Sequence, residues 1–251
     1  MFDISALNNG LTEKSKFYNK IYYFEIIDST NTFALNSDYP PHHVIIAGKQ
    51  LKGKGRSGRK WVSKSEDNLY LSIILPDIPL EKLLPLNIVT AYSIVDALRD
   101  IIPLKIKWPN DIIANGKKLG GILFEAKFSG YILEKLVLGI GLNINQKEFD
   151  GEISGIATSI YNETGIIYPL ETISLRIIQE FEKYLDNFLK NSIEIIENWC
   201  KYSANYNKSI SIHIDGVKKT FVEIGITENG ELIALDDMGN SIKILSGDID
   251  L

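Results

Sequence analysis

Basic residues and glycines are concentrated in one short segment, residues 52–60, which reads KGKGRSGRK and contains no acidic residue. Glycines allow positive φ angles and a close approach of the backbone to a ligand, and exposed N–H groups in such a loop can bind an anion. Arginine adds forked donors that match phosphate or carboxylate. The spacing fits neither the GxxxxGK[ST] loop nor a GxGxxG turn that opens a helix. Composition alone also permits a flexible, solvated loop.

A second motif reads KWPND and ends at Asp111, and the sequence KLGG follows from Lys118. Pro109 restricts the preceding tryptophan to an extended conformation, so this segment is a shaped loop. The pair Asn115-Gly116 predicts a two-residue hairpin turn, which would bring Asp111 and Lys118 near each other. A lysine aimed into a site suits a developing phosphate or carboxylate anion. A structural ion pair on a hairpin explains the same residues equally well.

Two shorter patterns are more ambiguous. Residues 139–145 read GIGLNIN, and glycines in an apolar strand imply close approach by another backbone or a ligand, to which Asn143 could present its amide. A bulge at a strand end is the alternative. Residues Ser29, Thr30 and Asn31 follow a predicted strand, where helix capping explains them without any ligand.

Composition limits the class of protein. The chain has 251 residues and a net charge of −5, which argues against general binding of nucleic acid or of an anionic membrane. Cys200 is the only cysteine, so no internal disulfide and no cysteine-based zinc cluster can form within one chain. We find no secretory signal and no run approaching the ~18 apolar residues of a membrane span. We therefore expect a cytoplasmic protein without a nucleic-acid or membrane partner.

Hydrophobic periodicity places the elements that must position these motifs. Strands are expected at residues 22–27, 43–47, 69–75, 105–108, 111–114, 119–127 and 136–145. Helices are expected after residues 28–31, from Pro85, and over 169–189 and 193–202, with 151–165 irregular. From residue 209 the period is two, with turns at 215–216, 229–230 and 239–240. We predict an α+β fold with a mixed central β-sheet, helices on one side, and a small C-terminal β-barrel, divided into domains 1–205 and 206–251.

Taken together, these segments resemble the biotin protein ligases, also called biotin–[acetyl-CoA-carboxylase] ligases. The matching segments are S-T-N at 29–31, the loop at 50–61 (family GRGRxGRxW), the strand at 68–72, KWPND at 107–111, KLGGIL at 118–123 and GxGxN at 139–143. The resemblance implies the fold that these ligases share with class II aminoacyl-tRNA synthetases and lipoate ligases. It also implies a C-terminal SH3-like domain, matched by residues 225–251.

The resemblance implies an ATP-dependent enzyme that converts biotin to biotinyl-5′-AMP and transfers biotin to a lysine of a biotin carboxyl carrier protein. It also implies Mg²⁺ with the ATP, a carrier belonging to acetyl-CoA carboxylase or pyruvate carboxylase, and possible homodimers through a sheet edge. The nearest alternative is a lipoate or octanoate ligase or transferase of the same superfamily. A non-catalytic ligand- or nucleic-acid-binding module is an alternative from a different class.

Site residues carry over by family match. Lys118 would be the central catalytic residue, with Arg56 acting beside it, whereas Lys117 is expected to face solvent. Biotin binding is expected from Ser29, Thr30, Asn31, Gln50, Gly53, Lys54, Arg56, Lys118 and Gly121. ATP binding is expected from Arg56, Arg59, Trp61, Asn110, Asp111, Lys118 and Asn143. Asp111 is also expected to bind or position Mg²⁺, and the basic loop is expected to order over the intermediate.

The sequence departs from the family pattern in two respects. Lys54 stands where the family usually has its first loop arginine, which removes one forked donor but retains the charge. About 20 residues precede the strand expected from Tyr22, too few for the winged-helix domain of the bifunctional ligase-repressors. We therefore expect an enzyme without an operator-binding role.

Overall fold

The computed structural model describes residues 2–63, 66–190, 198–214 and 217–249. Its centre is a seven-stranded sheet in the order β1-β2-β3-β7-β6-β5-β4. The strands are β1 (Ile21–Ile27), β2 (Val44–Gln50), β3 (Leu69–Leu75), β4 (Lys105–Lys107), β5 (Asp111–Ala114), β6 (Lys117–Ser129) and β7 (Ile132–Leu142). The β1–β2 pair is parallel and the other pairs are antiparallel, so the predicted mixed sheet is confirmed.

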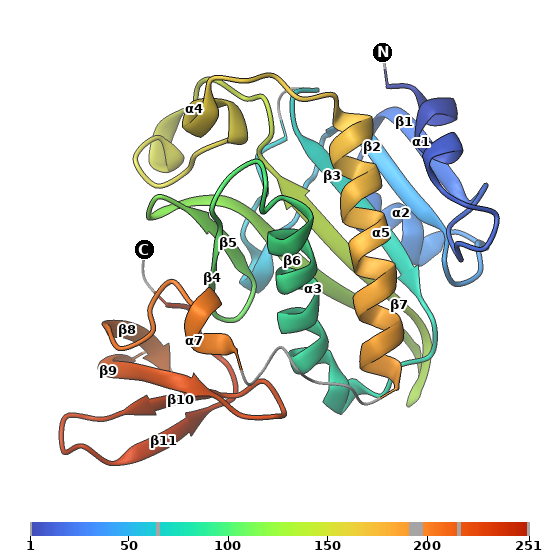
Figure 1. Ribbon diagram of the computed structural model, residues 1–251. Helices are drawn as coiled ribbons and strands as arrows, with labels where there is room; N and C mark the ends of the chain where they lie inside the picture. The colour runs from blue at the N-terminus through green and yellow to red at the C-terminus, as the bar shows by residue number, and fades with distance from the viewer. Residues whose placement is uncertain (1, 64–65, 191–197, 215–216, 250–251) are drawn as a thin grey trace.

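Helices cover both faces of this sheet. On one face, α3 (Leu83–Ala97) packs against α5 (Leu170–Leu189), and α1 (Ile4–Gly10) packs against α5, as Figure 1 shows. The short helix α2 (Thr30–Asn36) lies on the opposite face. There Ala34 packs with three strand residues on the same face of the sheet, Ile45, Ile74 and Val137. The expectation of helices on one side is therefore wrong for α2, because alternate strand residues create a second apolar face that must be buried.

The helices follow the sequence pattern with two differences. The α5 helix begins one residue after Pro169, where the expected range starts, and its buried stripe contains Ile173, Ile177 and Phe181. The α3 helix begins at Leu83, so Pro85 lies within its first turn, where no N–H is required. The segment expected to be irregular contains α4 (Ile160–Thr164), which the Ser159 hydroxyl caps and Gly165 ends with φ of 72°. Of the helix predicted at 193–202, residues 193–197 lie outside the described residues, and α7 (Trp199–Tyr202) is its described part.

The C-terminal part forms a separate four-stranded antiparallel sheet, the arrangement predicted for an SH3-like domain. Its strands are β8 (Ser209–Ile214), β9 (Val217–Ile226), β10 (Leu232–Leu235) and β11 (Ser241–Ile244). The predicted turns at 229–230 and 239–240 contain Gly230 and Gly239, both with positive φ, whereas 215–216 lies outside the described residues. The Trp108 indole donates to the Gly230 carbonyl at 2.9 Å, which joins this sheet to the KWPND loop. The domain division at residue 206 stays a prediction.

No helix within the described part of the chain is long and apolar enough to cross a membrane.

Candidate functional site

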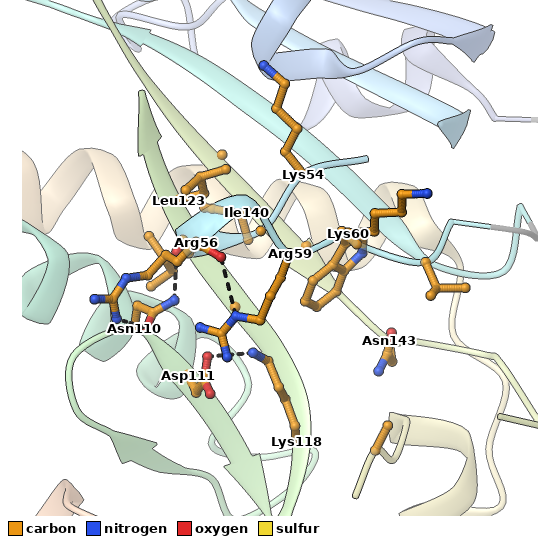
Figure 2. A pocket seen from close by; sticks show the side chains of 18 of the residues that line it. Lys54, Arg56, Arg59, Lys60, Asn110, Asp111, Lys118, Leu123, Ile140 and Asn143 are labelled. Carbon is orange, nitrogen blue, oxygen red and sulfur yellow. Dashed lines mark hydrogen bonds and ion pairs between the residues drawn. The ribbon is translucent and has the colours of Figure 1, made fainter. Parts of the chain in front are cut away.

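The predicted motifs meet in one cavity of about 390 Å³, shown from close by in Figure 2. It lies among the start of α2, the end of β2, the basic loop, the β5–β6 hairpin and β7. The predicted site residues that line it are Ser29, Thr30, Asn31, Gln50, Lys54, Arg56, Arg59, Trp61, Asn110, Asp111, Lys118, Gly121 and Asn143. Part of its apolar wall comes from β3, β6 and β7, namely Leu71, Ile122, Leu123 and Ile140.

Gly53 is the predicted site residue that does not line the cavity. A Cβ at this position would lie 2.5 Å from the Trp61 carbonyl oxygen and 3.0 Å from Ser63 Oγ. The Gly53 carbonyl accepts from the Trp61 amide at 3.0 Å. The glycine is therefore required where the two arms of the basic loop approach each other.

One end of the cavity is a buried polar network. The Ser29 hydroxyl caps α2, and this places Thr30 at the cavity wall. The backbone N–H and the hydroxyl of Thr30 donate to Gln50 Oε1 at 2.9 and 3.1 Å, while Gln50 Nε2 donates to Ser63 Oγ at 3.2 Å. Buried amide and hydroxyl groups require such partners. The network therefore holds the Gln50 amide in one orientation beside the cavity.

Ser72 and Glu125 fix the neighbouring Asn31. Ser72 Oγ lies 2.6 Å from Asn31 Oδ1 and 2.7 Å from Thr30 Oγ1, and Asn31 Nδ2 donates to Glu125 Oε2 at 2.9 Å. Gly139 makes room for this amide, since a Cβ there would lie 2.4 Å from Asn31 Oδ1. The first glycine of the GxGxN motif thus serves the packing of Asn31.

The centre of the cavity contains a carboxylate between two lysines. Asp111 Oδ1 lies 2.6 Å from Lys118 Nζ, and Asp111 Oδ2 lies 3.3 Å from Lys107 Nζ. Lys107 and Asp111 are 7% and 8% exposed, so these charges interact in a water-poor environment. Burial lowers the pKa of the Lys107 ammonium, while Asp111 opposes this shift. Lys118 is half-buried and lines the cavity, where its ammonium can contact a ligand as well as Asp111. Lys117 is exposed, as expected.

The basic loop folds over this centre. Residues Arg56–Gly58 form a short 3₁₀ turn, in which Ser57 has φ of 54° and Gly58 has φ of 74°. Arg56 donates to Asn110 Oδ1 at 2.8 Å, and the Arg59 side chain donates back to the Arg56 carbonyl at 3.3 Å, as Figure 2 shows. The left-handed residues let the chain reverse so that both arginines line the same cavity.

Lys54 lines the cavity but its side chain points away from Lys118 and toward Glu125. Its Nζ lies 3.0 Å from Glu125 Oε1, and Figure 2 shows the side chain directed away from Lys118. The position that departs from the family pattern therefore contacts the carboxylate that also holds Asn31.

Trp61 lies against the glycines of β6 and β7. A Cβ at Gly141 would lie 2.7 Å from the indole, and one at Gly121 would lie 3.5 Å from it. The Lys118 ammonium lies 5.7 Å from a Trp61 ring centroid, within cation–π distance. The indole N–H is buried and has no hydrogen-bond partner among the described residues. The second glycine of GxGxN therefore admits the tryptophan.

Asn143 completes the wall beyond Lys118. It is 7% exposed, and its amide nitrogen donates to the Thr158 carbonyl at 3.0 Å. The backbone of Lys118 forms two hydrogen bonds with the same 156–158 segment, at 2.7 and 2.9 Å. The segment thus links the lysine and the asparagine in a fixed arrangement.

Several residues of this site are not evident in the sequence. Lys107 begins the KWPND motif, but the motif does not show that its ammonium contacts Asp111, because this contact depends on the geometry of the loop between β4 and β5. Ser72 and Glu125 lie on interior strands, where their contact with Asn31 depends on strand pairing. The cavity-lining Ile249 and its neighbour Asp248 come from the distant C-terminal segment. The ion pairs of Asp248 with Arg56 and Arg59, at 3.4 and 2.9 Å, have no signal in the local pattern.

The residues do not build a dedicated metal centre. Within the described ranges, no group of three or more His, Cys, Asp and Glu side chains is arranged to hold a metal ion. The cavity-lining carboxylate of Asp111 is already shared by two ammonium groups. Magnesium is commonly held by only one or two carboxylates together with substrate phosphates. The arrangement fits a magnesium ion that arrives bound to a nucleotide and does not fit a resident metal.

The geometry suits a ligand with a polar head, an apolar body and an anionic end. The buried amides and hydroxyls can hydrogen-bond the polar head, and the aliphatic wall can contact the apolar body. Lys118, Arg56 and Arg59 would lie around the anionic end. Such an arrangement of fixed cations can stabilise charge that develops when a carboxylate meets a phosphate.

Comparison with known proteins agrees with this chemistry. The sequence model of the biotin/lipoate A/B protein ligase family matches residues 23–143. The chain is 31% identical over 242 residues to the bifunctional ligase/repressor BirA of Bacillus subtilis, covering 92% of this chain and 74% of that protein. The chain belongs to the biotin protein ligase family.

Other members of the family show how far the likeness extends. The biotin–[acetyl-CoA-carboxylase] ligase of Paracoccus denitrificans is 28% identical over 226 residues, which cover 86% of this chain and 94% of that ligase. The biotin protein ligase from Aquifex aeolicus, solved in complex with biotin and ATP, is 30% identical with a TM-score of 0.84. That match covers 93% of this chain and 98% of the other. The likeness therefore includes the C-terminal sheet as well as the central one.

Proposed function

We propose that this chain joins biotin to ATP to form biotinyl-5′-AMP and pyrophosphate, and then transfers the biotinyl group to one lysine of a carrier protein. Membership of the biotin protein ligase family supports the reaction. The observation that carries it is the position of Lys118, between the polar network of Thr30 and Gln50 and the basic loop. A lipoate ligase is disfavoured, because curated relatives with identities of 26 to 31% are named for biotin or for a bifunctional ligase/repressor.

The first half-reaction brings two anions together. A carboxylate oxygen of biotin attacks the α-phosphorus of ATP, the bond from that phosphorus to the β-bridging oxygen breaks, and pyrophosphate leaves. Lys118, Arg56 and Arg59 reduce the repulsion between the carboxylate and the phosphates, most strongly where water is excluded. The half-buried Lys118 can contact both groups, whereas the arginines reach the phosphates from the loop.

The second half-reaction uses the same cations. The amine of the carrier lysine attacks the acyl carbon, the bond from this carbon to the AMP oxygen breaks, and the amine loses a proton as the amide forms. Lys118 stabilises the charge that passes to the departing AMP phosphate. The basic loop shields the mixed anhydride from water until the carrier docks.

Residue roles follow from the two ends of the cavity. Thr30, Gln50 and Asn31 would bind the polar ring of biotin, with Ser29 fixing the start of the helix. Trp61 and Asn143 would contact the nucleotide, and their place in the wall of the cavity supports this assignment. ATP would enter as its magnesium complex, with Asp111 as the nearest protein carboxylate.

The proposal extends to the carrier protein and the cellular compartment. Relatives named biotin–[acetyl-CoA-carboxylase] ligase support a biotin carboxyl carrier protein as acceptor, and the pyruvate carboxylase carrier is a second candidate. Two copies of the chain would pair through a sheet edge, of which β1 is one. We propose the cytoplasm as the compartment and 1–205 and 206–251 as the domains.

Biotin-dependent exchange of labelled pyrophosphate into ATP tests the function. We expect exchange with biotin and none with lipoate or without an added acid. Exchange that requires lipoate would favour the alternative ligase. The absence of exchange with either acid would favour a non-catalytic binding module.

A further inference from the structure

The C-terminal segment 247–249 lies against the basic side chains of the cavity. Asp248 Oδ2 lies 2.9 Å from Arg59 Nη2, and Asp248 Oδ1 lies 3.4 Å from Arg56 Nη1. The Gly247 carbonyl accepts from Arg56 Nη2 at 3.4 Å. Two successive residues of the tail therefore contact the arginines that are proposed to bind phosphates.

The same segment is anchored on both sides of Asp248. The Ile249 carbonyl accepts from Lys107 Nζ at 2.9 Å, and Ile249 is paired in a β-bridge with Ile212 of β8. A Cβ at Gly247 would lie 2.6 Å from Ile212 Cγ2, so the tail runs close against β8. These contacts fix the backbone of Asp248 relative to the C-terminal sheet.

The charges around the cavity explain why such a carboxylate is needed. Among the residues that the structure describes, six basic side chains line it, namely Lys54, Arg56, Arg59, Lys60, Lys107 and Lys118. Asp111 is occupied by two of the lysines, and Glu125 pairs with Lys54. Arg56 and Arg59 are three residues apart in one glycine-containing turn and repel each other. A carboxylate between them lowers this repulsion and holds the turn over the cavity.

We propose that Asp248 is a positioning residue that holds Arg56 and Arg59 over the cavity before ATP binds. If the guanidinium groups are already ordered, the loop loses less conformational entropy when the nucleotide binds. The C-terminal sheet thereby takes part in nucleotide binding through the loop and does not itself need to touch ATP. The nature of the ligand rests on the proposed function, whereas the order of the loop does not.

Loop order is measured without any ligand. The full chain carrying Asp248→Asn is digested with limiting trypsin, and cleavage after Arg56 and Arg59 is followed by mass spectrometry. Asp248 is 37% exposed, so Asn should be accommodated without unfolding. We expect cleavage to accelerate about three- to tenfold, as for loss of a partly exposed charge-assisted contact. Asp248→Glu should return the rate toward wild type, and Asp237→Asn, an exposed carboxylate on the same sheet, should not change it.

Nucleotide binding is measured by biotin-dependent pyrophosphate exchange. In Asp248→Asn the KM for ATP should rise by a similar factor while kcat at saturating ATP stays within about twofold, since binding and not chemistry is affected. Unchanged cleavage in Asp248→Asn would overturn the proposal, as would a lower KM, which would mean that Asp248 competes with the phosphates. If the wild type shows no exchange, the proposed function fails, and the cleavage rates still decide the role of Asp248.

Discussion

The Lys118 ammonium lies 2.6 Å from Asp111 Oδ1 although the two residues are not opposite each other in the β5–β6 ladder. Lys118 is opposite Ile113, and Asp111 is opposite Gly121, with a bulge after Ile112. The length of the lysine side chain and the bulge bring the charges together. A Cβ at Gly121 would lie 3.5 Å from Lys118 Cε and Nζ, which is an ordinary van der Waals distance, so the contact does not require this glycine.

Replacing Asp111 by Asn should destabilise the protein and slow pyrophosphate exchange. The carboxylate interacts with the buried Lys107 as well as with Lys118, so its loss leaves a buried ammonium without its counter-ion. We expect the free energy of unfolding to fall by ~3 kcal/mol in denaturant titrations. Asp100→Asn removes the exposed ion pair with Arg176 and should have a much smaller effect. Equal destabilisation in the two variants would show that the ion pairs of Asp111 contribute no more to the free energy of unfolding than an exposed ion pair does.

Replacing Gly141 by Ala should displace Trp61. The added methyl group would lie 2.7 Å from the indole, so the ring or β7 must move, at a cost of ~1–3 kcal/mol in unfolding free energy. Because Trp61 lines the proposed nucleotide end, the KM for ATP should rise. Gly155→Ala is the matched control, since the space around its Cβ position is open. An unchanged KM and stability in Gly141→Ala would mean that Trp61 does not depend on this glycine.

Replacing Ser72 by Ala should weaken biotin binding more than ATP binding. The change removes the hydroxyl beside Asn31 Oδ1 and Thr30 Oγ1, so Asn31 Oδ1 loses its donor, whereas Thr30 Oγ1 keeps its hydrogen bond to Gln50. We expect the KM for biotin to rise about tenfold, or ~1.4 kcal/mol, with little change in the KM for ATP. Ser93→Ala removes an equally buried hydroxyl within α3 and should alter neither constant. A rise in both constants would argue for general disruption of the fold.

Replacing Glu223 by Gln should change the pH dependence of stability. Glu223 is fully buried and accepts from Trp199 Nε1 at 2.9 Å, and burial raises the pKa of its carboxyl although the hydrogen bonds from Ser203 and Trp199 oppose the shift. The folded protein therefore binds the proton more tightly than the unfolded chain, and the buried charge costs stability above the raised pKa. Gln keeps the acceptor without the charge, so the variant should be more stable at pH 8 by ~1 kcal/mol.

The advantage of Glu223→Gln should shrink as the pH falls through the raised pKa, because the wild-type carboxyl then becomes neutral as well. Denaturant titrations between pH 5 and pH 8 measure this difference, with the exposed Glu228→Gln as the control. A difference that is independent of pH would show that Glu223 does not titrate within this range.

Local patterns predicted the parts of the site that lie within one motif. The Asn115-Gly116 turn has positive φ at both residues, as the hairpin prediction requires, and Ser29 caps α2. Two kinds of information are absent from such patterns. Gly139 and Gly141 indicated a close approach, but only the tertiary structure shows that Asn31 and Trp61 make it. Asp248 is almost 200 residues from Arg56 in the sequence, so no periodicity or spacing connects them.

We propose that Lys118 is the catalytic residue at the end of the β5–β6 hairpin, and its neighbour Lys117 provides the matched control. A biotin carrier domain is incubated with biotin, ATP, magnesium and the enzyme, and the mass of the domain is measured. The wild type and Lys117→Ala should add one biotinyl group to a single lysine, whereas Lys118→Ala should leave the carrier unmodified. Full biotinylation by Lys118→Ala, or equal loss in both variants, would contradict the account.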